Sequence, residues 1–243
     1  MGMTVQATEL VIDTLIVLLT YFTIIPTIGW FRAWVAEKMG DDTPEQLGFL
    51  TVNPLAHVSF FWLTIMTLGL VPFGFGQYIP INPHNFHGTW RVPKMLAAYL
   101  SDAFANIVLA LVALFCFVLL FGSDPLEFFM SFSHTRAASL YPGYEYTSSF
   151  AIVVALLLRS IVFFNSMLAA FNIIVNLFYA GFFYLTQEYH GVFGMSAGDK
   201  IQWVMFIAPI VLLMLFVNKI HMGILWLIMS IGMWFWKYIS LLS

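Results

Sequence analysis

The stretch TIGWFRAWVAEKMGDDTPEQLGFLTVNPLAH, residues 27–57, decides the fold of this chain. It leaves an apolar segment, crosses a short acidic patch and re-enters an apolar segment at Asn53–Pro54. A hydrocarbon core about 30 Å thick needs about 20 helical residues, and apolar segments of that length flank the patch. The pattern indicates a chain that enters a membrane more than once.

The composition of the whole chain supports a membrane location. Of 243 residues, 61% are hydrophobic and only 9% are charged, whereas a soluble domain carries about 25% charged residues. The net charge of −3 and the nine basic residues exclude a nucleic-acid surface. We therefore expect a multi-pass protein of a bacterial inner membrane or its organellar equivalent, with other integral membrane proteins and lipids as partners. The single cysteine, Cys116, lies in an apolar run and is expected to be a packing residue.

The hydropathy pattern predicts an all-α membrane protein with one domain over residues 1–243. About six transmembrane helices are expected, at about 10–32, 54–72, 95–121, 148–185, 201–217 and 220–240. The fourth is too long for one straight span, so either a break near Asn172–Asn176 is expected or a strong tilt that carries the helix past the interface. The last two are separated only by NKIH, residues 218–221, which predicts a tight turn.

An irregular segment is predicted near 73–90. Residues 72–86, PFGFGQYIPINPHNF, carry too many prolines and glycines for a regular helix. Irregular backbone at membrane depth must be buried in protein or line water. A re-entrant hairpin or an extended segment beside the bundle is the expectation.

Three ionisable residues, Asp13, Asp102 and Arg159, stand inside apolar segments, and Asp13 lies only one turn from the end of its segment, from where it can reach the interface. Charges at membrane depth are costly and are usually paired or functional, so an Asp102–Arg159 ion pair is predicted. Two alternatives remain open for Arg159, which could reach the interface with its long side chain or pair with another subunit.

Buried amides and histidines are the other polar candidates. Four asparagines lie in apolar helices, and bonds between helices are expected for them, with a substrate-binding row as the alternative; they are Asn106, Asn165, Asn172 and Asn176. His84 and His87 are three residues apart, but a zinc site needs three or four ligands, so no metal and no cofactor is expected.

Three blocks of the sequence resemble the site-2 protease family of intramembrane zinc metalloproteases, in its compact branch without a PDZ domain. They are AWVAEKMGDDT (33–43), VNPLAH (52–57) and FGFGQYIPINPHNF (73–86), and their order and spacing follow the family pattern. The resemblance implies that motif residues are retained at Asn53, Pro54, His57, Asn82, Pro83 and Asn106.

The same resemblance implies that the catalytic positions are degenerate. Aligning on Ala33–Trp34 places the family's H-E-x-x-H on residues 28–32, so that Ile28, Gly29 and Arg32 stand where two zinc-binding histidines and the glutamate base are expected. The third-ligand aspartate falls on Ala180. Zinc hydrolysis needs side chains that hold the ion and a carboxylate that accepts the water's proton. Isoleucine, glycine, arginine and alanine supply neither, so an inactive relative is expected.

Three functions remain open from the sequence. The first is a catalytically inactive accessory or structural subunit, or an assembly factor, that acts through helix–helix contacts in a larger membrane complex. The second is a small transporter or channel, which would need a polar path through the bundle. The third is a cofactor-binding subunit in which His57 or His221 ligates a haem or chlorin.

Overall fold

The computed structural model describes residues 2–68, 70, 73–122, 124–126, 149–188 and 198–241, and these residues form helices and connecting segments. The helices are α1 (Gly2–Met39), α2 (Thr43–Gln46), α3 (Pro54–His57), α4 (Phe60–Thr67), the 3₁₀ turn η1 (Pro83–Asn85), α5 (Arg91–Phe121), α7 (Ser149–Glu188) and α8 (Gly198–Ser240). The prediction of an all-helical fold is confirmed.

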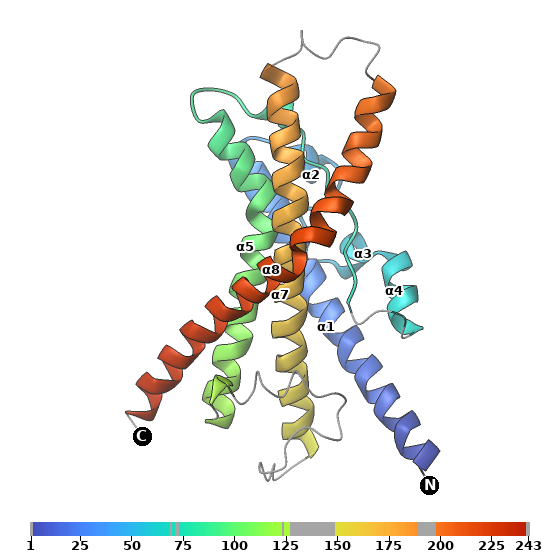
Figure 1. Cartoon of the computed structure of the whole chain (residues 1–243), viewed down its shortest axis with the longest axis vertical. Helices are drawn as coiled ribbons and strands as arrows, with labels where there is room; N and C mark the ends of the chain where they lie inside the picture. Colours follow the sequence, from blue (N-terminus) through green and yellow to red (C-terminus); the bar gives the residue numbers. More distant parts are fainter. Residues whose placement is uncertain are drawn as a thin grey trace.

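Four of the described helices are long and apolar enough to cross a membrane, so the prediction of about six spans is wrong. The four spans are Val11–Met39, Arg91–Phe121, Val153–Leu185 and Ile207–Ser240. In Figure 1 the chain ascends in α1, descends in α5, ascends in α7 and descends in α8, so both termini lie at one end of the bundle.

The predicted span 54–72 is absent because the chain turns back instead of crossing. The re-entrant segment, which we define as α3, α4 and the extended residues 73–82, lies beside α1 and returns to the end where α5 begins (Figure 1). Backbone groups at its break are satisfied by Tyr21 of α1, whose hydroxyl accepts from the Ser59 N–H at 3.0 Å and donates to the Phe75 carbonyl at 2.9 Å. This arrangement meets the requirement for irregular backbone near hydrocarbon, and the expectation of an extended segment near 73–90 agrees with it.

Two glycines let the extended residues 73–82 lie close to α1 and to the first leg of the segment. A Cβ on Gly76 would stand 2.7 Å from Ile25 Cγ2 and 2.9 Å from the His57 carbonyl oxygen, and one on Gly74 would overlap Met66 Sδ. The Gln77 N–H donates to the His57 carbonyl at 2.6 Å, which joins the two legs of the segment.

The predicted turn at residues 218–221 is also absent, because α8 runs through NKIH without interruption. Two of the polar side chains there have contacts within α8 or with α7. Lys219 Nζ lies 5.9 Å from the centre of the Phe216 ring, and buried His221 Nε2 lies 3.1 Å from Ser166 Oγ on α7. The predicted break at Asn172–Asn176 is wrong as well, since α7 is one continuous helix.

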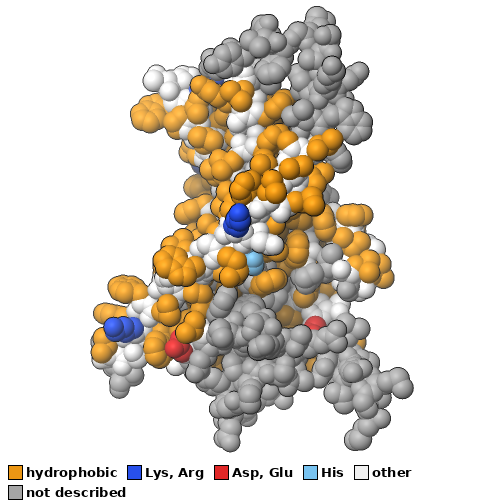
Figure 2. Space-filling model, in the orientation of Figure 1, with side chains coloured by type: hydrophobic (Ala, Val, Ile, Leu, Met, Phe, Trp, Pro, Cys, Tyr) orange, Lys and Arg blue, Asp and Glu red, His pale blue; other side chains and the backbone are white. Residues whose placement is uncertain are grey.

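Small residues bring the central helices together. Ala110 and Ala113 of α5 pack with Ala169 and Ala170 of α7 in one buried cluster, and α5 has its most extensive contacts with α7. Close approach through small side chains is the usual way in which membrane helices gain packing energy. Figure 2 shows hydrophobic side chains over most of the described face of the bundle, with few charged groups among them.

Candidate functional site

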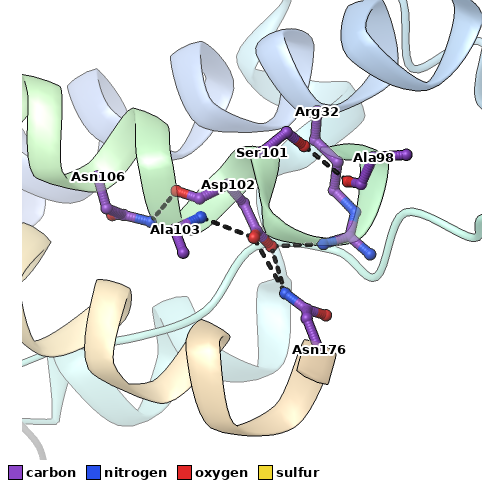
Figure 3. A network of polar contacts seen from close by, with 7 residues as sticks. All are labelled: Arg32, Ala98, Ser101, Asp102, Ala103, Asn106 and Asn176. Carbon is purple, nitrogen blue, oxygen red and sulfur yellow. Dashed lines mark hydrogen bonds and ion pairs between the residues drawn. The ribbon is translucent and has the colours of Figure 1, made fainter. Parts of the chain in front are cut away.

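A buried polar network joins α1, α5 and α7 (Figure 3). The Asp102 carboxylate of α5 accepts from Arg32 Nη1 of α1 at 2.5 Å and from Asn176 Nδ2 of α7 at 3.0 and 3.1 Å. It also accepts from the Ala103 N–H at 2.7 Å. Arg32, Asp102 and Asn176 are each no more than 8% exposed. A buried carboxylate with a cation and further donors is charge-balanced and hydrogen-bonded, as low-dielectric surroundings require.

The partner of Asp102 is therefore Arg32, and the predicted pairing with Arg159 is wrong. Arg159 lies half-buried on α7, in the half of the helix nearer Ser149, whereas Asp102 meets α7 at Asn176. From the sequence, Arg32 was expected only to stand at a position where the family resemblance places a zinc ligand, and to be unable to bind zinc there. In the structure it is the cation of the network.

His57 packs directly on Gly29. Its Nε2–H donates to the Thr51 carbonyl at 2.6 Å, while Nδ1 faces α1, where a Cβ on Gly29 would overlap the imidazole ring. Burial lowers the pKa of His57, and the hydrogen bond to Thr51 opposes this in part. The neutral Nε2–H tautomer fits these contacts.

The retained Asn-Pro motifs have a structural role. Asn53 Oδ1 accepts from the Leu55 N–H and begins α3, and Asn82 Oδ1 accepts from the His84 N–H and begins η1, in each case with proline at the first helical position. This is ordinary N-capping.

A buried carboxylate, Asp41, ties the end of η1 to the end of α1. Its oxygens accept from the Asn82 N–H at 2.8 Å, from Asn85 Nδ2 at 2.8 Å and from Thr43 Oγ1 at 2.6 Å. Asp41 was not predicted from the sequence to have a structural role, although its position just after a helix and before Thr43–Pro44 is typical of a capping carboxylate.

The asparagines behave differently from one another. Asn176 makes the predicted bond between helices, but Asn106 and Asn165 donate to carbonyls of their own helices, those of Asp102 and Ile161. Asn172 is half-buried and lines the cavity described next.

A cavity of about 800 Å³ lies among α1, the re-entrant segment, α5 and α7. Its polar lining includes Arg32, His57, Asp102, Asn106 and Asn176. Its apolar lining includes Ile25, Trp62, Phe73, Phe75, Leu168 and Phe171. Three of the positions at which the family resemblance places the zinc ligands and the base, Ile28, Gly29 and Arg32, therefore border one cavity.

The fourth position, Ala180, lies elsewhere in the core. It is 1% exposed and packs in an apolar cluster with Ala36, Ala98 and Tyr99. His84 and His87 are exposed near η1, and in the described ranges no group of three or more His, Cys, Asp or Glu side chains is placed to hold a metal ion.

The spans and the buried charges define the class of this chain, a multi-pass integral membrane protein. Its sequence is 35% identical over 102 residues to the "Putative zinc metalloprotease YwhC" of Bacillus subtilis (strain 168). The match covers 40% of this chain and 44% of that protein, so it is a distant and partial similarity. It agrees with the resemblance to the site-2 protease family that the motifs indicate. No family model matches the chain, and no solved structure matches it significantly.

Proposed function

We propose that this protein is a site-2-protease-like membrane protein without peptidase activity, which acts through helix–helix contacts as an accessory subunit or assembly factor of a membrane complex. The observation that carries the proposal is the Arg32–Asp102–Asn176 network. It lies where the resemblance implies a metal centre.

The residues at this position do not fit zinc. Arg32 stands at a ligand position, and its guanidinium is a cation that would repel a dication. The one carboxylate beside it, Asp102, already accepts from Arg32, Asn176 and the Ala103 N–H. Ile28 and Ala180 are buried in apolar clusters and offer no donor atom. A zinc site needs three or four N, O or S ligands.

There is also no space for a general base at residue 29. A glutamate at residue 29 would need its Cβ in the space that the His57 ring now occupies. The contact between His57 and Gly29 therefore supports a chain whose packing has adapted to the loss of the base.

The surface of α8 supports a role in contacts with other helices. Only 17% of its span is buried within the chain, against 39% for α1 and α5 and 44% for α7. Large exposed side chains, including Met214, Trp226 and Trp234, follow its length. Methionine and tryptophan adapt well to a partner helix or to lipid.

Metal content and proteolysis test the loss of activity. Protein purified after growth with added zinc is expected to carry substoichiometric zinc, to leave a synthetic transmembrane helix uncleaved and to keep its melting temperature when a chelator is added. The Arg32→Leu, Asp102→Asn double variant serves as the control, since it removes the only carboxylate in the network without leaving Arg32 as an isolated charge. Stoichiometric zinc together with chelator-sensitive cleavage would refute this part of the proposal.

Photo-crosslinking in native membranes tests the partner. A photoreactive residue at Trp226 of α8 is expected to give a discrete protein adduct of one mass, identifiable by mass spectrometry. The same residue at Val11 of α1 is the control, because Val11 is also exposed but lies on a different helix. If exposed positions along α8 yield lipid adducts alone, the accessory role is wrong.

The two alternatives from the sequence are less well supported. A transporter would need polar groups free to carry a solute, yet the Asp102 charge is neutralised by Arg32. For a haem or chlorin, His57 offers only Nδ1, which is packed on Gly29, and His221 Nε2 is engaged with Ser166.

A further inference from the structure

The cavity has a chemically mixed lining. Aromatic and aliphatic side chains, among them Trp62, Phe75 and Phe171, line it together with the polar side chains of Arg32, Asn106 and Asn172. A volume of about 800 Å³ lies within the range of roughly 300–1,000 Å³ that is usual for small-molecule sites. The mixed lining indicates a ligand with both an apolar chain and a polar head.

The polar lining residues carry no net charge. Arg32 and Asp102 form a buried ion pair, and the remaining polar groups are amides, the imidazole of His57 and the hydroxyls of Tyr78 and Tyr179. A carboxylate or phosphate head would add a charge that nothing there balances, at a cost that such a buried site does not repay. The head is therefore expected to be neutral.

Two buried polar atoms of the lining residues have no hydrogen-bond partner among the described residues and are not covered by Gly29. They are Arg32 Nε, a donor, and Asn106 Oδ1, an acceptor. A head group that both donates and accepts, such as a hydroxyl, satisfies both kinds of atom, and small side-chain adjustments bring it within reach.

We propose that this cavity binds a neutral, single-chain lipid with a hydroxylated head, of the monoacylglycerol class. The acyl chain lies among Trp62, Phe75 and Phe171, and the hydroxyl groups meet Asn172, Asn106 and Arg32. The volume suits one acyl chain better than the two chains of a phospholipid. This site does not depend on the proposed loss of peptidase activity, because the ion pair, the amides and the aromatic wall are features of the described chain itself.

Native mass spectrometry of the full chain in phosphatidylcholine nanodiscs tests the proposal. Three probes that share one chain are added separately: monooleoylglycerol, oleate and oleoyl-lysophosphatidylcholine. We expect a saturable one-to-one adduct with monooleoylglycerol, and at least tenfold weaker binding of the other two.

Variants separate the cavity from the general lipid surface. Val175→Phe fills the cavity and is expected to abolish the adduct, whereas Asn172→Leu is expected to weaken it about tenfold, the factor for one buried hydrogen bond. Leu177→Phe is the matched control, since Leu177 is exposed on the same helix and should leave binding unchanged. Equal binding of oleate, equal effects of Val175→Phe and Leu177→Phe, or a peptide that displaces the probe would each overturn the proposal.

Discussion

At the scale of single residues, the Arg32–Asp102 pair is the feature with the largest energetic consequence. Both side chains are buried, and each is the counter-charge of the other. A buried pair of this kind adds little net stability compared with apolar residues, because desolvation offsets the attraction. Removal of one partner is different, because it leaves an isolated charge inside the bundle.

Single substitutions in this pair should destabilise the protein more than the double substitution. We expect Asp102→Asn or Arg32→Leu to lower the free energy of unfolding by about 3–5 kcal/mol, and Arg32→Leu combined with Asp102→Asn to recover much of that loss. Unfolding of the purified protein in mild detergent measures the three values. Additive losses in the double variant would show that the two side chains do not act as a pair.

Gly29 provides a second prediction at this scale. Gly29→Ala is expected to destabilise the protein by about 1–3 kcal/mol, because the new methyl group would overlap the His57 ring. Gly181→Ala on α7 is the control. Among the described residues, nothing lies within 4 Å of the place that its new Cβ would take, so helix propensity should make it neutral or stabilising by up to about 1 kcal/mol. Melting temperatures of the two variants decide the matter, and equal shifts would contradict the close contact at Gly29.

At the scale of elements, the sequence predicted the helical class and the positions of α1, α5 and α7, but not the number of spans. The hydropathy of α5 and α7 was sufficient to find both helices, because each is apolar over a full membrane crossing. The re-entrant segment was mistaken for a span at 54–72, because its apolar composition matches that of a membrane helix. Its backbone is held by the Tyr21 hydroxyl and the Gln77 N–H, which both lie outside that window. Local composition does not contain such contacts.

The polar site was predictable in part. Asp102 was recognised from its apolar surroundings, but its partner was misassigned. Counting turns from a shared end of the bundle would have indicated Arg32. It lies about two turns before the end of α1, and Asp102 lies about three turns after the start of α5, whereas Arg159 lies near the opposite end of α7. Counting turns in this way requires the correct number of spans, and the hydropathy pattern predicted six instead of four.

The continuity of α8 gives a prediction for this scale. Lys219→Pro should cost about 3 kcal/mol or more, because proline removes a backbone hydrogen bond within the helix and collides with the preceding turn. Lys219→Ala should cost little, which makes it the matched control. Thermal unfolding and the helical circular dichroism signal report the difference. A fully tolerated proline would indicate a turn at residues 218–221.

At the scale of the whole molecule, the re-entrant segment determines which loops share a side of the membrane. In the observed fold the chain does not cross between α1 and α5, so the loop after α1 and the loop before α5 lie at one end of the bundle (Figure 1). A span at 54–72 would have placed them on opposite sides. The number of spans therefore determines from which side of the membrane these two loops can be labelled.

Cysteine accessibility tests this topology. In a Cys116→Ala background, Gln46→Cys and His87→Cys are expected to react with a membrane-impermeant maleimide from the same side of sealed vesicles. Asn218→Cys, within α8, should react from neither side before detergent is added. Labelling of residues 46 and 87 from opposite sides would restore the crossing at 54–72 and contradict the fold.

The hydroxyl of Tyr21 has a consequence for the way the protein is made. It bonds both legs of the re-entrant segment, at Ser59 and at Phe75, and it belongs to α1, which is synthesised before that segment. During insertion, the donor and acceptor that this backbone requires are therefore already in the bilayer when the segment leaves the ribosome. Its other side is covered later, when Phe171 of α7 packs on Phe75 with ring centres 4.3 Å apart. The re-entrant segment is thus covered from lipid first by α1 and then by α7, in the order in which these helices are translated.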